Sequence, residues 1–536
     1  MNAVGSRPAP LSVAARERNI EHLRQGSFDL LIIGGGINGA GVARDAAMRG
    51  LRVALVEKGD FASGTSSKSS KLIHGGVRYL QQGDIRLVRM ACRERDLLRR
   101  RLAPHLVQPL AFLFPVYRGD PVGFFTLGVG MWLYDLLAAF RNIRRHRMLS
   151  AQRTGAFEPG LRTQRLRGAA LYYDCFTDDA RLALETVLAA QEEGAVIVNY
   201  VELREFIKKD GQIVGAVLRD RVVGTELRVR CHSVVNTTGP WADQVRRLDD
   251  PVAKPCLRVT KGVHILVPRE RIGNTHAVVM HSPRDRRVLF TIPWAAHNII
   301  GTTDTDFHGS PDEVRADTAD VEYLLEAANW YFPDARLRPE DVISSYAGLR
   351  PLVASEVDKG PSAVSREEQI FESSSGLITL GGGKLTTYRL VAKQIVDLVI
   401  KRLRAGRGSP QPRRKPCATS RKPLPGGRRP DPDEMARALT SSDGVGLADE
   451  QIRHLVSRYG SRAPEVIALI QNDADLKDML VAKLPDIWAE AAYAVRTEMA
   501  VRSEDVLLRR THVALKEPQE AARLADKISE KLKLSE

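Results

Sequence analysis

The sequence predicts an α/β fold in which a Rossmann-like dinucleotide-binding domain is interleaved with an antiparallel-sheet domain and followed by an all-α C-terminal domain. Three features lead to this prediction: a strand, glycine turn, helix and strand near the N-terminus, alternating apolar segments in the middle of the chain, and helical spacing in the C-terminal part. With 536 residues, the chain is also longer than one hydrophobic core supports.

The first supersecondary unit lies directly after a charged N-terminal stretch. Apolar residues predict strands at 28–33 and 52–56, and a helical pattern lies between them at 40–48. Two strands joined by a helix form a βαβ unit, which predicts a parallel sheet.

The turn between the first strand and the helix matches G-x-G-x-x-G at Gly34, Gly36 and Gly39. Gly34 permits the tight turn, Gly36 lets a pyrophosphate approach the backbone, and Gly39 lets the helix pack on the strand. The phosphates are expected at the helix N-terminus. Glu57 ends the second strand, where an acid that binds the ribose hydroxyls is expected.

Later segments complete the two predicted sheets. Further strands are predicted at 195–198, 212–218, 233–235 and 376–380, and alternating patterns at 263–267 and 288–292 predict the antiparallel sheet. We divide the chain into an N-terminal extension at 1–28, the nucleotide-binding domain with its interleaved substrate domain at 29–403, a Pro-, Gly- and Arg-rich linker at 404–432 and a helical domain at 433–536.

Composition narrows the class and the compartment. Hydrophobic residues make up 43% and charged residues 27%, which excludes a disordered or fibrous chain. The five cysteines include no CxxC pair, which argues against a disulfide framework or a zinc ribbon and favours a reducing cytoplasm. The N-terminus lacks an apolar run typical of a signal peptide.

Two segments could contact a membrane. Residues 122–140 are strongly apolar and are followed by Arg141, Arg144, Arg145 and Arg147, whereas 84–101 predict an amphipathic helix with a basic face. The first segment fits either an interfacial helix or a buried core helix, and the second fits either a solvated face or an anionic contact. The formal net charge of +15 comes without a nucleic-acid-binding motif, so we expect no nucleic-acid partner.

Three segments of small residues favour a flavin over a nicotinamide as the dinucleotide. They lie at 65–76, 234–241 and 379–387, and each offers backbone donors along an extended groove. The glycine fingerprint alone does not distinguish the two cofactors.

Ten motifs along the chain match one protein family. They are GGGINGAGVARDAAMRG at 34–50, TSSKSSKLIHGGVRYL at 65–80, DCFTDDARL at 174–182, NTTGPWA at 236–242, KGVHILVP at 261–268, TIPW at 291–294, IIGTTDTD at 299–306, YAGLRPL at 346–352, SAVSRE at 362–367 and GGGKLTTYR at 381–389. The matches run in family order from Asp29 to Ala392, with weaker similarity at 424–427 and 507–512. With these motifs the sequence resembles the FAD-dependent, quinone-linked glycerol-3-phosphate dehydrogenases of bacterial type.

The resemblance implies a flavin domain of the glutathione-reductase or amino-acid-oxidase type. It also implies FAD as cofactor, oxidation of sn-glycerol 3-phosphate to dihydroxyacetone phosphate, and reoxidation by ubiquinone or menaquinone. A cytoplasmic enzyme held peripherally on the inner face of the cell membrane by anionic lipid is expected, and a homodimer is among the expected partners.

The resemblance also suggests site residues. The cofactor-binding residues are expected to be Gly34, Gly36, Asn38, Gly39, Glu57, Thr65, Ser66, Ser67, Lys71, Leu72, His74, Gly239, Gly383, Lys384, Leu385 and Thr386. The substrate-binding residues are expected to be Arg78, Tyr79, Arg350, Arg366 and Lys384, and the catalytic residues His264, Arg350 and Lys384.

The chemistry assigns roles to some of these groups. Arginine forks suit a dianionic phosphate, so Arg350 and Arg366 are expected on the phosphate and Arg78 and Lys384 near the substrate oxygens or the flavin edge. Loss of the hydroxyl proton requires a base, for which His264 is a candidate. Alternatively, Arg350 stabilises the developing alkoxide electrostatically.

Other functions stay open at this stage. They are a glycerol-3-phosphate oxidase that uses oxygen, an amine or amino-acid oxidase of the same superfamily, and a non-catalytic flavin-stabilised scaffold. No metal site is predicted, because Asp178, Asp179, Asp304 and Asp306 are better explained as turn caps. Cys175 is expected to be buried packing.

Overall fold

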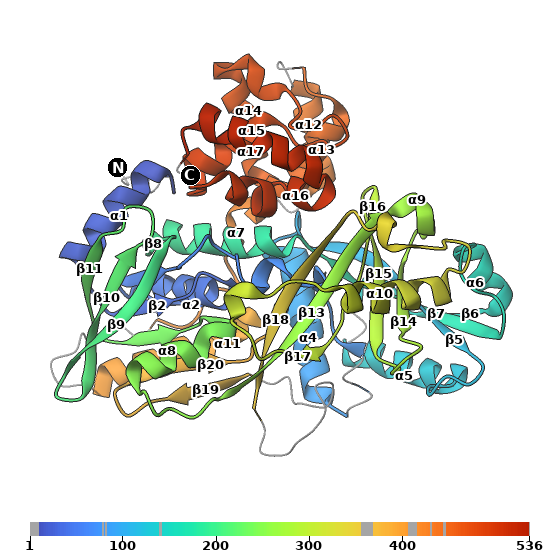
Figure 1. The fold of residues 1–536 in the computed structure, drawn as a ribbon, viewed down its shortest axis with the longest axis horizontal. Helices are drawn as coiled ribbons and strands as arrows, with labels where there is room; N and C mark the ends of the chain where they lie inside the picture. Colours follow the sequence, from blue (N-terminus) through green and yellow to red (C-terminus); the bar gives the residue numbers. More distant parts are fainter. Residues whose placement is uncertain are drawn as a thin grey trace.

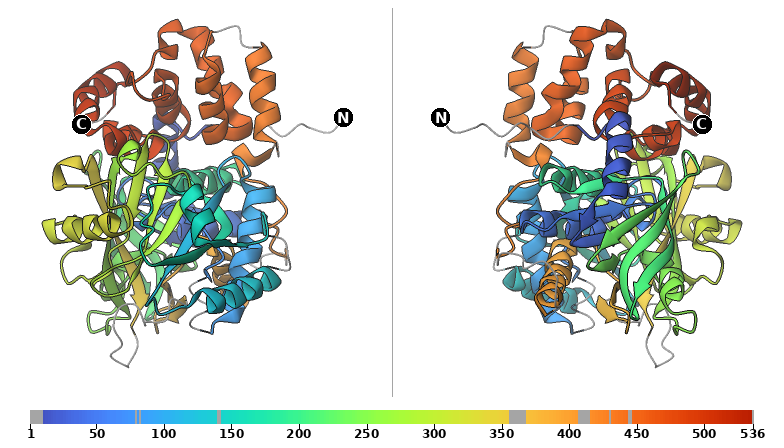
Figure 2. Two further views of the ribbon diagram at one scale, coloured as in Figure 1. Left: turned by 90° about the vertical axis from the view of Figure 1, so that its right-hand side faces the viewer. Right: turned by 90° about the vertical axis from the view of Figure 1, so that its left-hand side faces the viewer.

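The computed structural model describes residues 10–77, 80, 83–138, 142–354, 368–405, 415–428, 431–442 and 446–534 (Figure 1). The predicted α/β class is confirmed: three sheets and their helices form the body, and a set of C-terminal helices lies above them (Figures 1 and 2).

The nucleotide-binding sheet has six strands in the order β19-β20-β12-β2-β3-β8. Four of its pairings are parallel, and only the edge strand β19 runs antiparallel to its neighbour. The strands are β2 (Leu30–Ile33), β3 (Val53–Val56), β8 (Val196–Val198), β12 (Val234–Asn236), β19 (Gln369–Glu372) and β20 (Leu377–Gly381).

Both faces of this sheet are covered, which explains its continuous apolar runs. Leu30 and Ile32 pack with helices α2 (Ile37–Met48), α7 (Asp179–Glu192) and α11 (Tyr388–Ala405). Leu31 and Ile33 point to the other face, where a four-stranded sheet covers them. That sheet comprises β1 (Ser27–Phe28), β9 (Val201–Lys209), β10 (Gln212–Asp220) and β11 (Glu226–Cys231).

The predicted N-terminal extension contains helix α1 (Val13–Gln25), which packs against β8 and β11. Its Arg16 is buried and forms an ion pair with Asp220 at 2.7 Å. The extension therefore contributes to the body of the protein.

The third sheet is largely antiparallel and has ten strands, with the main path β17-β13-β16-β15-β14-β5-β7-β4. β18 pairs with β13, and β6 pairs with β7. The strands are β4 (Leu72–Ile73), β5 (Gln108–Tyr117), β6 (Arg147–Ser150), β7 (Leu166–Phe176), β13 (Leu257–Pro268), β14 (Ala277–His281), β15 (Val288–Trp294), β16 (His297–Gly301), β17 (Thr305–Asp306) and β18 (Ser344–Val353).

Strand alternation in β13 separates the core from the site. Val263, Ile265 and Val267 pack with α10 (Thr318–Tyr331) on one face. Because side chains alternate along a strand, His264 points to the opposite face. That face is also covered by α4 (Ile85–Leu97) and α5 (Phe124–Leu137), and α4 continues into the π-helical turn η2 (Leu98–Leu102).

The apolar segment forms α5, which has one buried and one exposed face. Leu127, Met131 and Tyr134 are buried against the sheet. The opposite face exposes apolar side chains at helical spacing: Phe125, Val129, Trp132, Leu133 and Leu136. Among the described residues, no helix combines the length and the apolar character that crossing a bilayer requires.

The C-terminal part is helical, as predicted. Its elements are α12 (Pro432–Ser442), α13 (Asp449–Tyr459), α14 (Ala463–Asn472), α15 (Trp488–Thr497), the π-helical turn η10 (Asp505–Arg510), α16 (Val513–Lys516) and α17 (Pro518–Leu532). Short elements elsewhere are α6 (Ala151–Phe157), α8 (Ala242–Asp249) and α9 (Arg269–Ile272). Within the predicted linker, only 404–405, 415–428 and 431–432 are described.

Candidate functional site

The glycine turn after β2 leaves no room for side chains. Gly34 has a φ of +108°, and a Cβ added there would lie 2.8 Å from the carbonyl oxygen of Thr237. A Cβ at Gly39 would lie 1.9 Å from the carbonyl oxygen of Gly34. These close approaches bring the N-terminus of α2 beside the ends of β2 and β12, where a dinucleotide phosphate is expected.

Glu57 and Ser66 fix the neighbouring loops. The Glu57 carboxylate accepts hydrogen bonds from the amides of Gly35 at 2.7 Å and Gly59 at 2.9 Å. Burial raises the pKa of Glu57, and these amide contacts oppose the rise. Ser66 Oγ accepts from the Ile37 amide at 3.0 Å and so caps the start of α2.

A groove of about 650 Å³ runs from this turn along the sheet end. Asn38 lies in the wall of the groove, and its Oδ1 is buried without a partner among the described residues. Gly383 packs closely against Asn38, because an added Cβ would lie 2.6 Å from Asn38 Nδ2. Ten of the predicted cofactor residues line the groove: Gly34, Gly36, Asn38, Glu57, Thr65, Ser66, Gly239, Gly383, Lys384 and Leu385.

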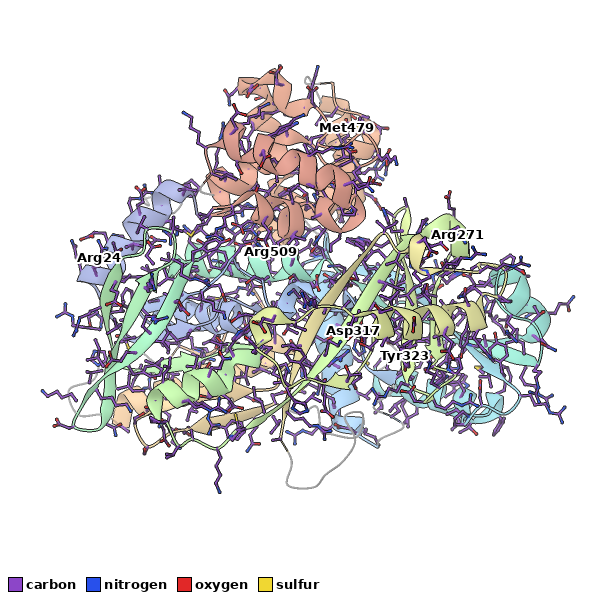
Figure 3. All side chains as sticks on the ribbon, in the orientation of Figure 1. Arg24, Arg271, Asp317, Tyr323, Met479 and Arg509 are labelled. Carbon is purple, nitrogen blue, oxygen red and sulfur yellow. The ribbon has the colours of Figure 1, made fainter. Side chains whose placement is uncertain are left out.

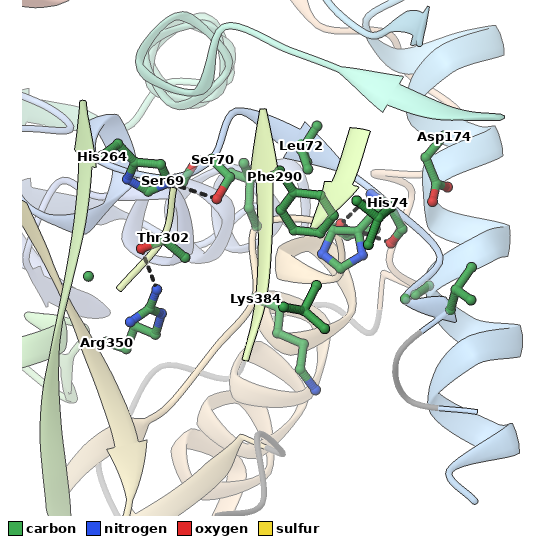
Figure 4. Close-up of a pocket in the computed structure, with 18 of the residues that line it drawn as sticks. Ser69, Ser70, Leu72, His74, Asp174, His264, Phe290, Thr302, Arg350 and Lys384 are labelled. Atoms are coloured by element: carbon green, nitrogen blue, oxygen red, sulfur yellow. Dashed lines mark hydrogen bonds between the residues drawn. The ribbon is translucent and has the colours of Figure 1, made fainter. Parts of the chain in front are cut away.

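A second cavity, which we call the reaction cavity, has a volume of about 290 Å³ (Figure 4). It shares wall residues with the groove, so the two spaces adjoin: Thr65, Lys68, Ser69, Lys384 and Leu385. The reaction cavity also contains His264 and Arg350 from the antiparallel sheet, and the predicted cofactor residues Leu72, His74 and Thr386.

His264 is buried in the wall of the reaction cavity. Its ring stacks on Tyr346 with a centroid distance of 4.8 Å, and its Nε2 lies 2.8 Å from Ser70 Oγ (Figure 4). Nδ1 is buried and has no partner among the described residues. Burial, and then the positive charges of Arg350 and Lys71, hold the pKa of His264 well below its usual value of 6.5. The imidazole is therefore neutral near pH 7 and can accept a proton.

Arg350 faces the same space from β18. Its Nη2 donates to Thr302 Oγ1 at 2.8 Å, and its Nη1 lies 3.2 Å from Asp304 Oδ1 (Figure 4). The guanidinium lies across Gly262, where an added Cβ would be 2.4 Å from Nη2. This planar cation can bind a phosphate or a developing oxyanion.

Lys71 lies behind the reaction cavity. Its ammonium pairs with Asp179 at 2.5 Å, and both side chains are fully buried. The same carboxylate accepts from the Ser69 hydroxyl at 2.7 Å and the Ser69 amide at 3.0 Å. The pair therefore anchors the turn that presents Ser70 to His264.

The remaining predicted residues lie elsewhere. Gly39, Ser67 and Lys71 line neither cavity. Arg78, Tyr79 and Arg366 lie outside the described residues. Asp178 caps α7 as predicted, and Cys175 is buried with a pKa raised by burial to about 12.

Sequence reasoning missed several polar groups in these cavities. Ser70, Thr302 and Asp304 contact the two candidate catalytic side chains, and Lys68 and Trp241 line the groove. Thr302 and Asp304 belong to the segment 299–306. The hydroxyl and acidic side chains gathered in that segment were the available signal.

The parallel sheet, the glycine cradle and the adjoining polar cavity define a dinucleotide-dependent oxidoreductase. Family models agree with this class. Residues 29–398 match the model described as FAD dependent oxidoreductase, and residues 417–534 match the C-terminal domain of alpha-glycerophosphate oxidase.

Individual relatives narrow the assignment. The chain is 38% identical to the aerobic glycerol-3-phosphate dehydrogenase of Staphylococcus aureus (strain USA300) over 94% of this chain and 89% of that protein. The solved glycerol-3-phosphate dehydrogenase from Bacillus halodurans, complexed with FAD, superposes with a TM-score of 0.80 at 32% identity over 98% of this chain and 95% of the other. L-alpha-glycerophosphate oxidase from Mycoplasma pneumoniae shares the fold, with a TM-score of 0.56 at 18% identity over 75% and 100% of the chains.

The chain therefore belongs to the FAD-dependent glycerol-3-phosphate dehydrogenase family, and the resemblance seen in its motifs is confirmed. The cofactor is FAD, as the small-residue segments predicted. The glycine cradle and the unpartnered Asn38 amide oxygen fit such a dinucleotide.

Proposed function

We propose that the protein oxidises sn-glycerol 3-phosphate to dihydroxyacetone phosphate and passes the two electrons to a membrane quinone. The names of its relatives support the substrate, because the aerobic glycerol-3-phosphate dehydrogenases match nearly the whole chain. The observation that carries the proposal is the shared cavity of His264 and Arg350, which combines a neutral buried base with a guanidinium.

The substrate loses a hydride from C2 and a proton from its hydroxyl group when the alcohol becomes a ketone. Bound FAD supplies the acceptor for the hydride. Neutral His264 takes the hydroxyl proton, and Ser70 holds the ring in place through the 2.8 Å contact. The resulting imidazolium is short-lived, because the cations of Arg350 and Lys71 disfavour it and promote proton release.

Cations orient the phosphate. Arg350 binds it together with Arg366, and Lys384 lies where the reaction cavity meets the groove and contacts the substrate oxygens. Arg287 also lines the cavity and adds a further positive charge. Arg78 and Tyr79 complete the substrate contacts in this proposal.

An anaerobic titration tests the reaction. Purified holoenzyme is mixed with sn-glycerol 3-phosphate, and the flavin absorbance is followed before and after addition of a quinone analogue. We expect bleaching by the substrate and recovery with the quinone. An intact flavin that does not bleach would refute the proposed substrate. Peroxide formation with oxygen as fast as turnover with the quinone would favour the oxidase alternative.

We place the membrane contact on the exposed face of α5. Phe125 is 83% exposed and Leu136 57% exposed, and basic side chains at Arg144 and Arg147 lie close by in sequence. An apolar helix face next to cations suits the interface of an anionic bilayer. The enzyme then reaches its quinone from the inner face of the cell membrane as a peripheral protein.

Replacing Phe125 and Leu136 by Ser tests this surface. Each lost apolar contact is worth about 1.5–3 kcal/mol, so partitioning onto anionic vesicles should fall by roughly a hundredfold or more. Val223 and Val252, also exposed but on other elements, provide the matched control when both are replaced by Ser. Equal binding of both variants and of the wild type would refute the placement on α5.

A further inference from the structure

A third cavity lies apart from the reaction cavity, between α4, η2, the end of α5 and the start of α11. Its volume is about 610 Å³, and we call it the arginine cavity. The lining residues combine six arginines with a single acidic residue: Arg89, Cys92, Arg93, Arg95, Asp96, Leu97, Arg100, Arg101, Leu137, Ala138, Arg389 and Ser420.

Two of the arginines are part of the buried frame. Arg95 donates to the Tyr134 hydroxyl at 3.0 Å and pairs with Asp174. Arg389 binds Glu94 through two hydrogen bonds of 2.6 and 2.8 Å. Both guanidinium groups are held in place and their charges are compensated by these carboxylates, so they form a fixed wall and the uncompensated charge comes from the outer arginines.

The outer arginines have a different environment. Arg100 pairs with Asp96 at 2.7 Å. Arg89, Arg93 and Arg101 are exposed, and no carboxylate in the described part of the chain pairs with them. Several positive charges around one cavity repel each other, so an anion bound between them would be favoured.

The cavity chemistry indicates which anion. Arginine forks match the tetrahedral oxygens of a phosphate, and Ser420 adds a hydroxyl donor. The lining also includes an apolar wall, formed by Leu97, Leu137 and Ala138. A phosphate that carries an apolar substituent suits both walls, whereas a free phosphate would use only one.

We propose that the arginine cavity binds the phosphate group of an anionic phospholipid. Leu137 connects the cavity to the exposed apolar face of α5, whose Trp132 and Leu136 point to solvent. A lipid with its phosphate among the arginines would lie alongside that face. The inference rests on the proposed membrane contact and adds to it a defined headgroup site.

The test compares two triple variants with the same loss of charge. Arg89, Arg93 and Arg101 are replaced by Gln in the cavity variant, and the holoenzyme is assayed for binding to phosphatidylcholine vesicles with and without phosphatidylglycerol. The control replaces by Gln three exposed arginines of other strands that form no ion pair with a described residue: Arg167, Arg219 and Arg228.

Each cation near an anionic surface contributes roughly fivefold to binding, so the cavity variant should bind phosphatidylglycerol vesicles on the order of a hundredfold more weakly. The control should bind within about threefold of the wild type, since distant charges are screened. Binding to pure phosphatidylcholine should be equal in all three proteins. Equal losses in both variants would overturn the site, because net charge alone would then explain binding.

Two further measurements separate other outcomes. Inorganic phosphate that releases the wild type from vesicles as effectively as soluble phosphatidylglycerol would overturn the lipid assignment in favour of a free phosphate. Flavin bleaching by sn-glycerol 3-phosphate should be unchanged in the cavity variant, so failure of the proposed reaction would be seen independently of the lipid site.

Discussion

At the scale of single residues, surroundings determine what His264 can do. An exposed histidine would be half protonated near pH 6.5 and would be a poor base in acid. Burial, Arg350 and Lys71 all favour the neutral ring, whereas no carboxylate among the described residues hydrogen-bonds to it. The cations that suit a phosphate therefore also keep the imidazole unprotonated, as its proposed role as a base requires.

This arrangement predicts the pH dependence of flavin reduction. In the proposed reaction the neutral form of His264 is the active one. Because its pKa is lowered, the rate constant should stay constant as the pH falls through 6.5 and decline only at more acidic pH. Anaerobic stopped-flow measurements with saturating substrate would check this. A decline centred on pH 6.5 would contradict the lowered pKa.

The variant His264→Gln tests the same role by removal. Glutamine retains a polar contact to Ser70 but cannot take up the proton, so the reduction rate should fall by on the order of 10² to 10⁴. The FAD content and melting temperature should stay near those of the wild type. A loss below about tenfold would favour electrostatic catalysis by Arg350 without a histidine base.

At the scale of elements, strand register builds the site. β13 pairs with β16 and β18 so that His264 lies opposite Gly301 and Tyr346, and Gly262 lies opposite Gly348. An added Cβ at Gly301 would lie 2.3 Å from the His264 ring. Glycines in these strands therefore give the imidazole and the guanidinium of Arg350 room to lie across the sheet surface.

The variant Gly262→Ala should displace Arg350 and leave the sheet intact. The added methyl would meet only the end of a flexible side chain, at 2.4 to 2.7 Å from its guanidinium atoms. A hydrogen bond to a charged group is worth about 1.5–3 kcal/mol, so kcat/KM for sn-glycerol 3-phosphate should fall by roughly ten- to a hundredfold. Gly155→Ala in α6, with its nearest neighbour at 3.6 Å, is the control. An unchanged kcat/KM, or a large drop in melting temperature, would contradict this account.

The elements also show what a sequence can predict. Runs of Val, Ile and Leu predicted the strands because burial of both faces leaves a clear local pattern, as in 53–56 and 234–236. The meeting of His264 and Arg350 depends on pairing between distant strands, so it followed from the family resemblance and not from spacing. Ser70 was not singled out because nothing local distinguishes it from the serines around it.

At the scale of the whole molecule, buried charges attach the C-terminal helices to the body. Asp60, in the loop after β3, binds Arg509 at 2.6 Å and Arg510 at 2.5 and 3.0 Å, and Figure 3 shows Arg509 at the base of the helical domain. Arg181 of α7 pairs with Glu498 at 2.6 Å, and all these side chains are buried. The helical domain predicted at 433–536 is therefore joined to the flavin domain by an ionic interface.

This interface predicts sensitivity to acid. Burial alone would raise the pKa of Asp60, but the guanidinium groups of Arg510 and Arg509 outweigh it and hold the pKa below its usual value. A carboxyl group with a lowered pKa stabilises the folded state above its unfolded pKa of about 3.9, and this contribution is lost as the pH falls toward the folded value. The variant Asp60→Asn removes the carboxylate that both guanidinium groups share and leaves Arg509 with Asp505 at 2.7 Å and Arg510 with the more distant Glu498 at 3.6 Å. Breaking this buried network should cost up to about 3–5 kcal/mol at neutral pH.

Melting temperatures of wild type and variant across pH would check both expectations. The gap between them should be wide at pH 7 and should narrow below about pH 4, because the wild type then loses the charge that the variant already lacks. Glu326→Gln, which removes an exposed ion pair with Arg284, is the control and should cost at most about 1 kcal/mol. A constant gap at all pH values would mean that the Asp60 carboxylate does not hold the helical domain in place.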